Sequence, residues 1–155
     1  MNEDERFMGE ALKEAFKAAE RGEVPVGAVI VSGERIMARG RNQPIKKNDP
    51  TAHAEIVALR KACAQQKNYR LAADVMYVTI EPCAMCLGAI VQARIKRLVF
   101  GALDPKAGAV LSIMTFPVER TNHRMEILGG VLAEECGCVL KNFFKAKRAE
   151  VKPTR

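Results

Sequence analysis

The sequence predicts a single α/β domain of three layers, α/β/α, in which helices cover both faces of a mixed sheet of about five strands. Two observations predict this class. Short apolar segments with strand character alternate with longer segments whose apolar residues recur every three or four positions. The chain has 155 residues, which suits one hydrophobic core, so we expect a single domain over residues 1–155 without a linker.

The N-terminal third of the chain predicts a helix, a hairpin and a loop. Apolar residues recur at helical spacing over residues 3–21, and Gly22 follows as a stop signal. Residues 24–31 and 35–40 are β-rich runs joined by a Ser-Gly-Glu turn, which indicates a hairpin at one end of the sheet. Residues 42–50 are polar and contain proline, so we expect a loop there.

The remainder of the chain alternates strands and helices. Thr51 is expected to cap a helix that runs through Cys63. Pro82 suits the first turn of a second helix, with residues 83–92, because its missing amide hydrogen would lack a partner there in any case. Further strands are expected at residues 75–80, 97–100 and 125–128, and a long basic helix at residues 132–150.

The charge and the cysteine content narrow the classes of binding partner and the cellular compartments that fit this chain. The 25 Lys and Arg residues exceed the 18 Asp and Glu residues, and the net charge of +7 raises the local concentration of polyanions. Nucleic acid therefore fits as a partner, although many soluble domains carry such a charge for solubility alone. Neither a signal peptide nor a run as long as a membrane span is visible, so we expect a cytoplasmic protein without a membrane partner. Five cysteines in such a chain are expected to be thiols or metal ligands.

Two short motifs carry the chemistry, a His-Ala-Glu motif at residues 53–55 and a Pro-Cys-Ala-Met-Cys motif at residues 82–86. Cys83 and Cys86 stand three positions apart and share a helix face, and the imidazole of His53 completes a common zinc ligand set. In the first turn of a helix, free amides and the positive end of the dipole favour thiolate over thiol. The pattern therefore predicts one Zn²⁺ held by three protein ligands.

The predicted metal site has the character of a catalytic centre. Structural zinc sites close all four positions with protein atoms, whereas these motifs place no fourth ligand, so one position stays open for water. Residues two apart on a helix point to different sides, which gives His53 and Glu55 different roles. Two thiolates neutralise the charge of zinc and should acidify bound water less than an all-histidine site does, so a carboxylate base nearby becomes useful. Glu55 fits that need.

The two motifs resemble, residue for residue, those of the cytidine and deoxycytidylate deaminase superfamily. Four segments are similar to the bacterial tRNA-specific adenosine deaminases, namely residues 22–28, 49–55, 77–83 and 122–124. The resemblance covers nearly the whole chain. It implies a cytidine-deaminase-like fold, one Zn²⁺ per subunit and a homodimer.

The resemblance further implies hydrolysis of adenosine to inosine at the wobble position of a tRNA anticodon, with the anticodon stem-loop as partner. Glu55 would take a proton from the zinc-bound water, the hydroxide would attack C6 of adenine, and Glu55 would pass protons to N1 and to the leaving ammonia. Asn42 matches the family's asparagine that hydrogen-bonds the target nucleoside, and Ala54 is a further expected substrate contact. Asp104 matches a loop residue that contacts the RNA backbone.

The C-terminal helix offers the cationic surface that RNA binding needs. An enzyme acting on a base within RNA must take that base from its stack and hold the flanking loop. Phe144 and Arg148 are the expected RNA contacts, and they stand beside Phe143 and three lysines, so that rings can stack on bases while the charges bind phosphates. The alternative is an amphipathic helix that buries its phenylalanines under a solvated basic face.

Two rival functions stay open at this point. A deaminase of a free base or nucleotide, such as guanine, cytosine or deoxycytidylate, would use the same zinc chemistry but would not require the basic C-terminal helix. A zinc-stabilised RNA-binding module without catalysis would explain the charge and the cysteines, but it would leave Glu55 idle and would want a fourth protein ligand.

Other histidine and cysteine residues are expected to be structural. His123 stands alone in a polar segment. Cys63 lies on the apolar face of its helix, where a thiol serves as a small hydrophobic side chain. Cys136 and Cys138 are too close in sequence to share a helix face, and no histidine stands nearby to complete a second metal site.

Overall fold

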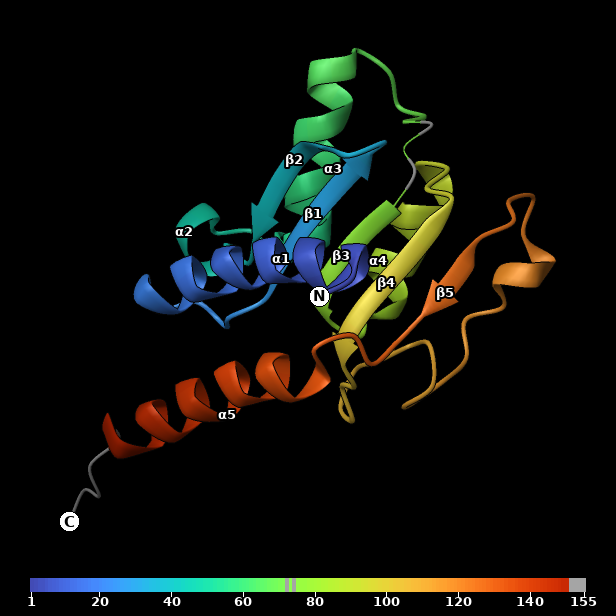
Figure 1. Cartoon of the computed structure of the whole chain (residues 1–155). Helices are drawn as coiled ribbons and strands as arrows, with labels where there is room; N and C mark the ends of the chain where they lie inside the picture. The colour runs from blue at the N-terminus through green and yellow to red at the C-terminus, as the bar shows by residue number, and fades with distance from the viewer. Residues whose placement is uncertain (72, 74, 151–155) are drawn as a thin grey trace.

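The computed structural model describes residues 1–71, 73 and 75–150, so the end of the predicted domain, residues 151–155, lies outside the described residues. The elements in chain order are α1 (Glu3–Glu20), β1 (Gly27–Ser32), β2 (Arg35–Arg41), α2 (Pro44–Lys47), α3 (Ala54–Gln66), β3 (Val75–Ile80), α4 (Ala84–Gln92), β4 (Arg97–Ala102), the 3-10 helix η1 (Val118–Arg120), β5 (Glu126–Leu128) and α5 (Ala133–Glu150) (Figure 1). Within the described ranges, no helix combines the length and the apolar character needed to cross a membrane.

The strands form one mixed sheet in the order β2-β1-β3-β4-β5. Strand β1 is antiparallel to both β2 and β3, whereas β3, β4 and β5 run parallel to one another. The predicted hairpin therefore lies at one end of the sheet, as β1 and β2. The predicted α/β class, with a mixed sheet that is antiparallel at its hairpin end, is confirmed.

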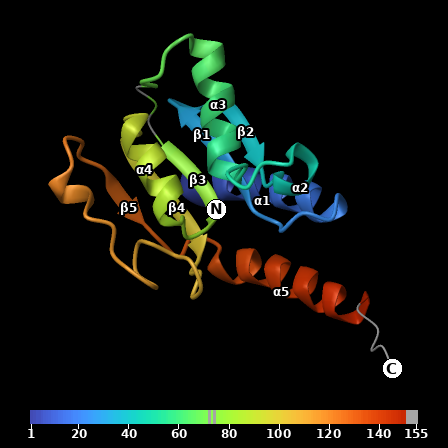
Figure 2. The same ribbon diagram turned by 180° about the vertical axis from the view of Figure 1, so that it is seen from behind.

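Helices cover both faces of this sheet, because successive strand residues point to opposite sides. Ala28 and Ile30 of β1 face the larger core, which lies under α3 and α4. Val29, between them, faces a second core with Phe7 of α1 and Cys136 of α5. Figures 1 and 2 show α3 and α4 on one side of the sheet and α1 and α5 on the other. The far end of α5 extends away from the sheet. The predicted three layers are present.

Gly40 lets α3 pack unusually close to β2. A Cβ atom at this position would lie 2.4 Å from the carbonyl oxygen of Ala54 and 2.6 Å from the backbone nitrogen of Ala58. No side chain fits within such distances, so the absence of a Cβ is a steric requirement here. The contact fixes the N-terminal part of α3 against the sheet.

The expected loop at residues 42–50 contains a one-turn helix, α2. A carboxylate far back in the sequence explains it, since Glu23 is buried and accepts hydrogen bonds from the backbone N–H groups of Ile45 (3.2 Å) and Lys46 (2.9 Å). These bonds satisfy donors that the first turn of a helix leaves without partners. The local sequence, polar and rich in loop formers, does not reveal this long-range cap.

The two long internal helices begin later than predicted. His53, with extended backbone angles, occupies the N-cap position of α3, while the Thr51 hydroxyl donates to Asp49 Oδ1 at 2.7 Å instead. The prediction that Thr51 caps this helix is therefore wrong. Cys83 occupies the N-cap position of α4, so Pro82 precedes the helix and is not in its first turn.

The N-terminal helix is tied to the sheet by one carboxylate. Asp4 accepts two hydrogen bonds from the Arg97 guanidinium (2.8 and 2.9 Å) and one from the Tyr77 hydroxyl (2.8 Å). The bond from Arg97 is the main cause that lowers the pKa of Asp4, and Tyr77 adds to it. Burial and the same bond to Asp4 raise the pKa of Tyr77. The cluster joins α1, β3 and β4.

Replacing Asp4 with Asn is expected to lower the free energy of unfolding at neutral pH by about 1–3 kcal/mol, because charge-assisted bonds to a partly buried group are lost. Since folding lowers the pKa of Asp4, its contribution is complete above the unfolded value of about 3.9 and disappears as the pH falls through the folded value. Urea unfolding of both proteins at neutral pH and below about pH 3 measures this. A difference that does not shrink in acid would contradict the assignment.

Candidate active site

The two motifs meet where helices α3 and α4 begin. His53 is the N-cap residue of α3, Cys83 is that of α4, and Cys86 is buried in the first turn of α4. His53 Nδ1 lies 3.6 Å from Cys83 Sγ and 3.5 Å from Cys86 Sγ. All three candidate ligand atoms lie within 4.8 Å of one another, and no second group of this kind occurs in the part of the chain that the structure describes.

The donor set fits a tetrahedral metal ion. Bonds of about 2.0–2.3 Å from zinc to nitrogen and sulfur place neighbouring tetrahedral ligands about 3.5–3.8 Å apart. The nitrogen-to-sulfur distances at the cluster, 3.5 and 3.6 Å, match that spacing. Nδ1 is the imidazole nitrogen that faces both sulfurs. The cluster can therefore hold one divalent ion with three protein ligands.

The two thiols differ in their tendency to ionise. The hydrogen bond from Cys86 lowers the pKa of Cys83 to about 4, with His53 adding to the effect against the opposing influence of burial. The same bond, together with burial, raises the pKa of Cys86. The bond to Cys83 raises the pKa of His53. One thiolate is thus ready at neutral pH, and a cation at the cluster would compete for the remaining proton.

Glu55 lies beside the cluster without belonging to it. Its side chain is buried in the first turn of α3, and the ligand group excludes it. Burial raises the pKa of Glu55 to about 7, although its own backbone amide and the positive charge of His53 oppose the shift. A carboxyl group with such a pKa can both accept and release a proton near neutral pH, as a general acid/base must. This is the role that the sequence predicts for it.

Asn42 joins the end of β2 to the start of α3. Its side-chain oxygen accepts the backbone N–H of Ala54 at 2.8 Å, which caps the helix in place of the predicted Thr51. The side-chain NH₂ group of Asn42 makes no hydrogen bond within the described residues, and the residue is only partly buried. A donor held in a fixed orientation is therefore available next to His53. Ala54 itself is fully buried.

Asp104 and Phe144 lie on the same cavity although they are far apart in sequence. The cavity, of about 470 Å³, is walled on one side by residues 103–106 and on the other by α5, where Lys141 and Phe144 line it. Phe144 is 43% exposed, whereas Phe143 is partly buried and packs edge-on against it. The alternative in which the helix buries its phenylalanines is therefore wrong for Phe144. Arg148 is exposed one turn further along α5 and does not line the cavity.

Comparison with known proteins places this geometry in a family. The family model described as MafB19-like deaminase matches residues 1–148. A tRNA-specific adenosine deaminase of Haemophilus influenzae is 52% identical over 151 residues, which cover 96% of this chain and 87% of the relative. The chain belongs to the tRNA-specific adenosine deaminase family. The resemblance predicted from the sequence motifs is confirmed.

Solved structures agree with membership of the tRNA-specific adenosine deaminases. A structure from work on A-to-I editing by tRNA:A34 deaminases at the wobble position is 47% identical, has a TM-score of 0.82, and covers 87% of this chain and 99% of that chain. A guanine deaminase from Nitrosomonas europaea has a TM-score of 0.76 over 90% of this chain and 83% of its own, at 23% identity. That likeness extends to the fold alone.

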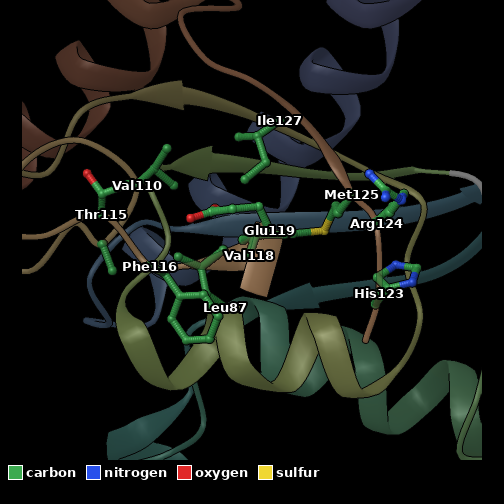
Figure 3. Close-up of a pocket in the computed structure, with 11 residues that line it drawn as sticks. Leu87, Val110, Thr115, Phe116, Val118, Glu119, His123, Arg124, Met125 and Ile127 are labelled. Carbon is green, nitrogen blue, oxygen red and sulfur yellow. The ribbon is translucent and has the colours of Figure 1, made fainter. Parts of the chain in front are cut away.

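A second cavity of about 300 Å³ is lined by Leu87 of α4 and by residues between Ala109 and Ile127. Figure 3 shows Phe116 and Val118 facing Leu87 of α4, with His123 and Arg124 at one end. The His123 Nε2 atom is hydrogen-bonded to the backbone carbonyl oxygen of Ile95. His123 thus ties a loop to the domain, which agrees with the structural role predicted for it.

The remaining cysteines carry no sign of a second metal site within the described residues. Cys63 packs at the edge of the larger core, and burial raises the pKa of its thiol. Cys136 is buried in the second core, whereas Cys138 is exposed. The expectation that Cys63 serves as a small hydrophobic side chain is confirmed.

Sequence reasoning missed Glu81, which stands between β3 and the Pro-Cys motif. It is 1% exposed, yet it belongs to no metal-ligand group within the described residues. Burial alone would raise the pKa of Glu81, but hydrogen bonds from the backbone of Leu111, Ser112 and Asp104 and from the Ser112 hydroxyl bring it down to about 2. The only local signal is an acidic residue at the end of an apolar strand, which an exposed turn would show as well.

Proposed function

We propose that this chain hydrolyses adenosine to inosine at the wobble position of a tRNA anticodon, using one Zn²⁺ held by His53, Cys83 and Cys86. The observation that carries the proposal is the cluster of three ligand atoms beside a buried carboxylic acid, in a chain of the tRNA-specific adenosine deaminase family. Three protein ligands leave the fourth tetrahedral position for water, which is the pattern of a catalytic zinc site.

Glu55 performs the proton transfers in this proposal. Zinc at the cluster would supply Lewis acidity that makes a water molecule a stronger acid. Glu55 takes a proton from the attacking water and delivers it to N1 of adenine as the C6–O bond forms. It then takes the remaining proton of the new hydroxyl group and delivers it to the amino group at C6, and the C6–N bond breaks, so adenosine and water give inosine and ammonia. The pKa of about 7 that burial gives Glu55 suits both directions of transfer.

Asn42 orients the target nucleoside. Its oxygen is turned toward the Ala54 N–H, which leaves the NH₂ group as the donor that the side chain presents to a ligand. This fixes the hydrogen-bond polarity, and a ligand must offer an acceptor there. Ala54 contributes by holding the amide of Asn42 in place, and a direct contact between Ala54 and the nucleoside stays a prediction.

The anticodon stem-loop is proposed to bind along the cavity between residues 103–106 and α5. Phe144 offers a partly exposed ring there, and base–aromatic stacking suits splayed nucleotides of an RNA loop. Arg148, exposed further along α5, would meet a phosphate, and Asp104 would contact the backbone of the same loop. A homodimer and a cytoplasmic location are implied by the family resemblance and stay predictions.

Metal content tests the ligand set. We expect one zinc ion per chain in the purified protein, and a Cys83→Ser variant should lose most of it because the thiolate with the lowest pKa is gone. Cys138→Ser is the matched control, since that thiol is exposed and remote from the cluster. Elemental analysis and X-ray absorption measure the outcome. A spectrum with four side-chain donors would remove the catalytic interpretation.

Glu55→Gln tests the acid/base. The variant should keep its zinc and lose about 10²–10⁴ in kcat, because an amide of the same shape cannot relay protons. Glu14→Gln is the matched control: Glu14 is equally buried, but it lies on α1 and pairs with Lys17. Inosine formation under saturating substrate is the measurement. Retention of most activity by the Glu55→Gln variant would exclude Glu55 from the mechanism.

Substrate choice separates an RNA enzyme from a free-base deaminase. The protein is expected to form inosine from an anticodon stem-loop RNA and not from free nucleosides. Phe144→Ala should raise KM for the stem-loop about 5- to 100-fold with kcat little changed, since one stacked base is worth about 1–3 kcal/mol. Phe16→Ala, which removes an exposed ring from α1, is the control and should behave like wild type. Product from free nucleosides or bases alone would favour the rival function.

A further inference from the structure

Glu81 stands between the sheet and two parts of the proposed site. One is the metal-ligand turn, residues 82–86, and the other is the wall of the substrate cavity, as we call the cavity between residues 103–106 and α5. Glu81 directly follows β3 and is two residues before Cys83. Its backbone N–H donates to the carbonyl oxygen of Ala102 at 2.8 Å, at the end of β4. The side chain is 1% exposed. A charged group so placed requires several donors, because burying an unsatisfied carboxylate is costly.

The segment 104–112 supplies those donors. One carboxylate oxygen of Glu81 accepts the backbone N–H of Asp104 (3.0 Å) and the hydroxyl of Ser112. The other oxygen accepts the backbone N–H groups of Val110 (2.9 Å), Leu111 (2.8 Å) and Ser112 (3.1 Å). A single side chain therefore closes both ends of the segment. Only an acceptor with two oxygens satisfies this arrangement.

Gly108 shows how tightly the segment encloses the carboxylate. A Cβ atom at Gly108 would lie 2.2 Å from both Cδ and Oε1 of Glu81. The next residue, Ala109, donates its N–H to the carbonyl oxygen of Pro82 at 2.9 Å. The segment is thus wrapped around Glu81 and also bonded to the turn that presents Cys83. Nothing larger than glycine fits at position 108 without displacing the carboxylate.

The first residues of segment 104–112 form part of one wall of the substrate cavity. Residues 103–106 face Phe144 and Lys141 across it. Asp104 accepts hydrogen bonds from the N–H groups of Lys106 and Ala107, so its own side chain is fixed once its backbone is fixed. Glu81 is absent from the ligand group and from the residues that line the cavity. An effect of Glu81 on the binding of a ligand in this cavity would therefore pass through the segment.

We propose that Glu81 is a positioning residue, whose buried carboxylate holds segment 104–112 so that the RNA-facing wall keeps a fixed place relative to the metal-ligand turn. The inference rests on the proposed function and extends it from the residues that meet the RNA to the group that places them. In this role Glu81 supports substrate binding through the segment and takes no part in metal binding or proton transfer.

Glu81→Gln tests the proposal with an isosteric change. The NH₂ group must replace one of the two oxygens, and the side with the Ser112 hydroxyl is the more tolerant because a hydroxyl can accept as well as donate. The N–H of Asp104 then loses its acceptor. We expect KM for the anticodon stem-loop to rise about tenfold or more, kcat to stay within about threefold, and zinc content to remain that of wild type. A fall in kcat at unchanged KM, or loss of zinc, would overturn the proposal.

Gly108→Ala disturbs the contact between Glu81 and the segment by a change in the segment itself. It replaces Glu81→Gln as the test if that variant does not fold. Both substitutions disrupt the same contact. The double variant should therefore show the KM of the worse single variant within about twofold, and not the product of the two effects. Independent, multiplying effects would overturn the proposal. Asp4→Asn is the control for lost stability: it weakens the bonds that Asp4 of α1 accepts from Tyr77 and Arg97, which lie outside segment 104–112, and should leave KM unchanged.

Amide hydrogen exchange provides a readout that does not depend on activity. In the Glu81→Gln variant, exchange should speed up about tenfold or more within residues 104–112, while α1 and β1 exchange as in wild type. Unchanged exchange in this segment would overturn the inference, whatever the substrate. If wild type forms no inosine in the stem-loop, the proposed function fails, and the exchange result still decides whether Glu81 holds the segment.

Discussion

The functional assignments depend on the meeting of two helix N-termini at one edge of the sheet. His53 and Cys83 are each the N-cap residue of a helix, so the position of each ligand is set by how its helix is held. Helix α3 packs closely against β2 because Gly40 has no side chain, and the hydrogen bond from the Ala54 N–H to Asn42 fixes the start of the helix. Small shifts of either helix would therefore move a candidate ligand directly, so the spacing of the three candidate ligand atoms depends on how the helices pack against the sheet.

The residues of the cluster could be predicted because their chemistry is local. The pair formed by Cys83 and Cys86 is three positions apart, and one helical turn is enough to bring both sulfurs to one face. Strand β3 matches its expected bounds, residues 75–80, since a short apolar run has few alternatives inside a domain. The meeting of His53 with this pair, 30 residues away, has no local signal; it was predicted because imidazole completes a common zinc ligand set, and the resemblance to a known family supported it.

The features that could not be predicted depend on contacts between distant residues. Helix α2 exists in a polar, proline-containing loop because Glu23 caps it from 22 residues away. The cap of α3 comes from Asn42 across 12 residues and not from the neighbouring Thr51. A hydrogen-bond acceptor has no periodic pattern that would mark its partner, so capping by residues outside the helix is invisible to analysis of spacing.

Two buried glutamates near the active site show how the number of donors decides a residue's role. Glu55 and Glu81 are 3% and 1% exposed, so burial penalises ionisation of both. Glu81 is surrounded by backbone N–H groups, which bring its pKa to about 2, whereas at Glu55 burial outweighs the interactions that oppose it and raises the pKa to about 7. A carboxylate fixed in its charged form holds structure but cannot exchange protons near neutral pH. A carboxyl group with a pKa near 7 can, which supports the proposed assignment of the proton transfers to Glu55 and of the placement of the cavity wall to Glu81.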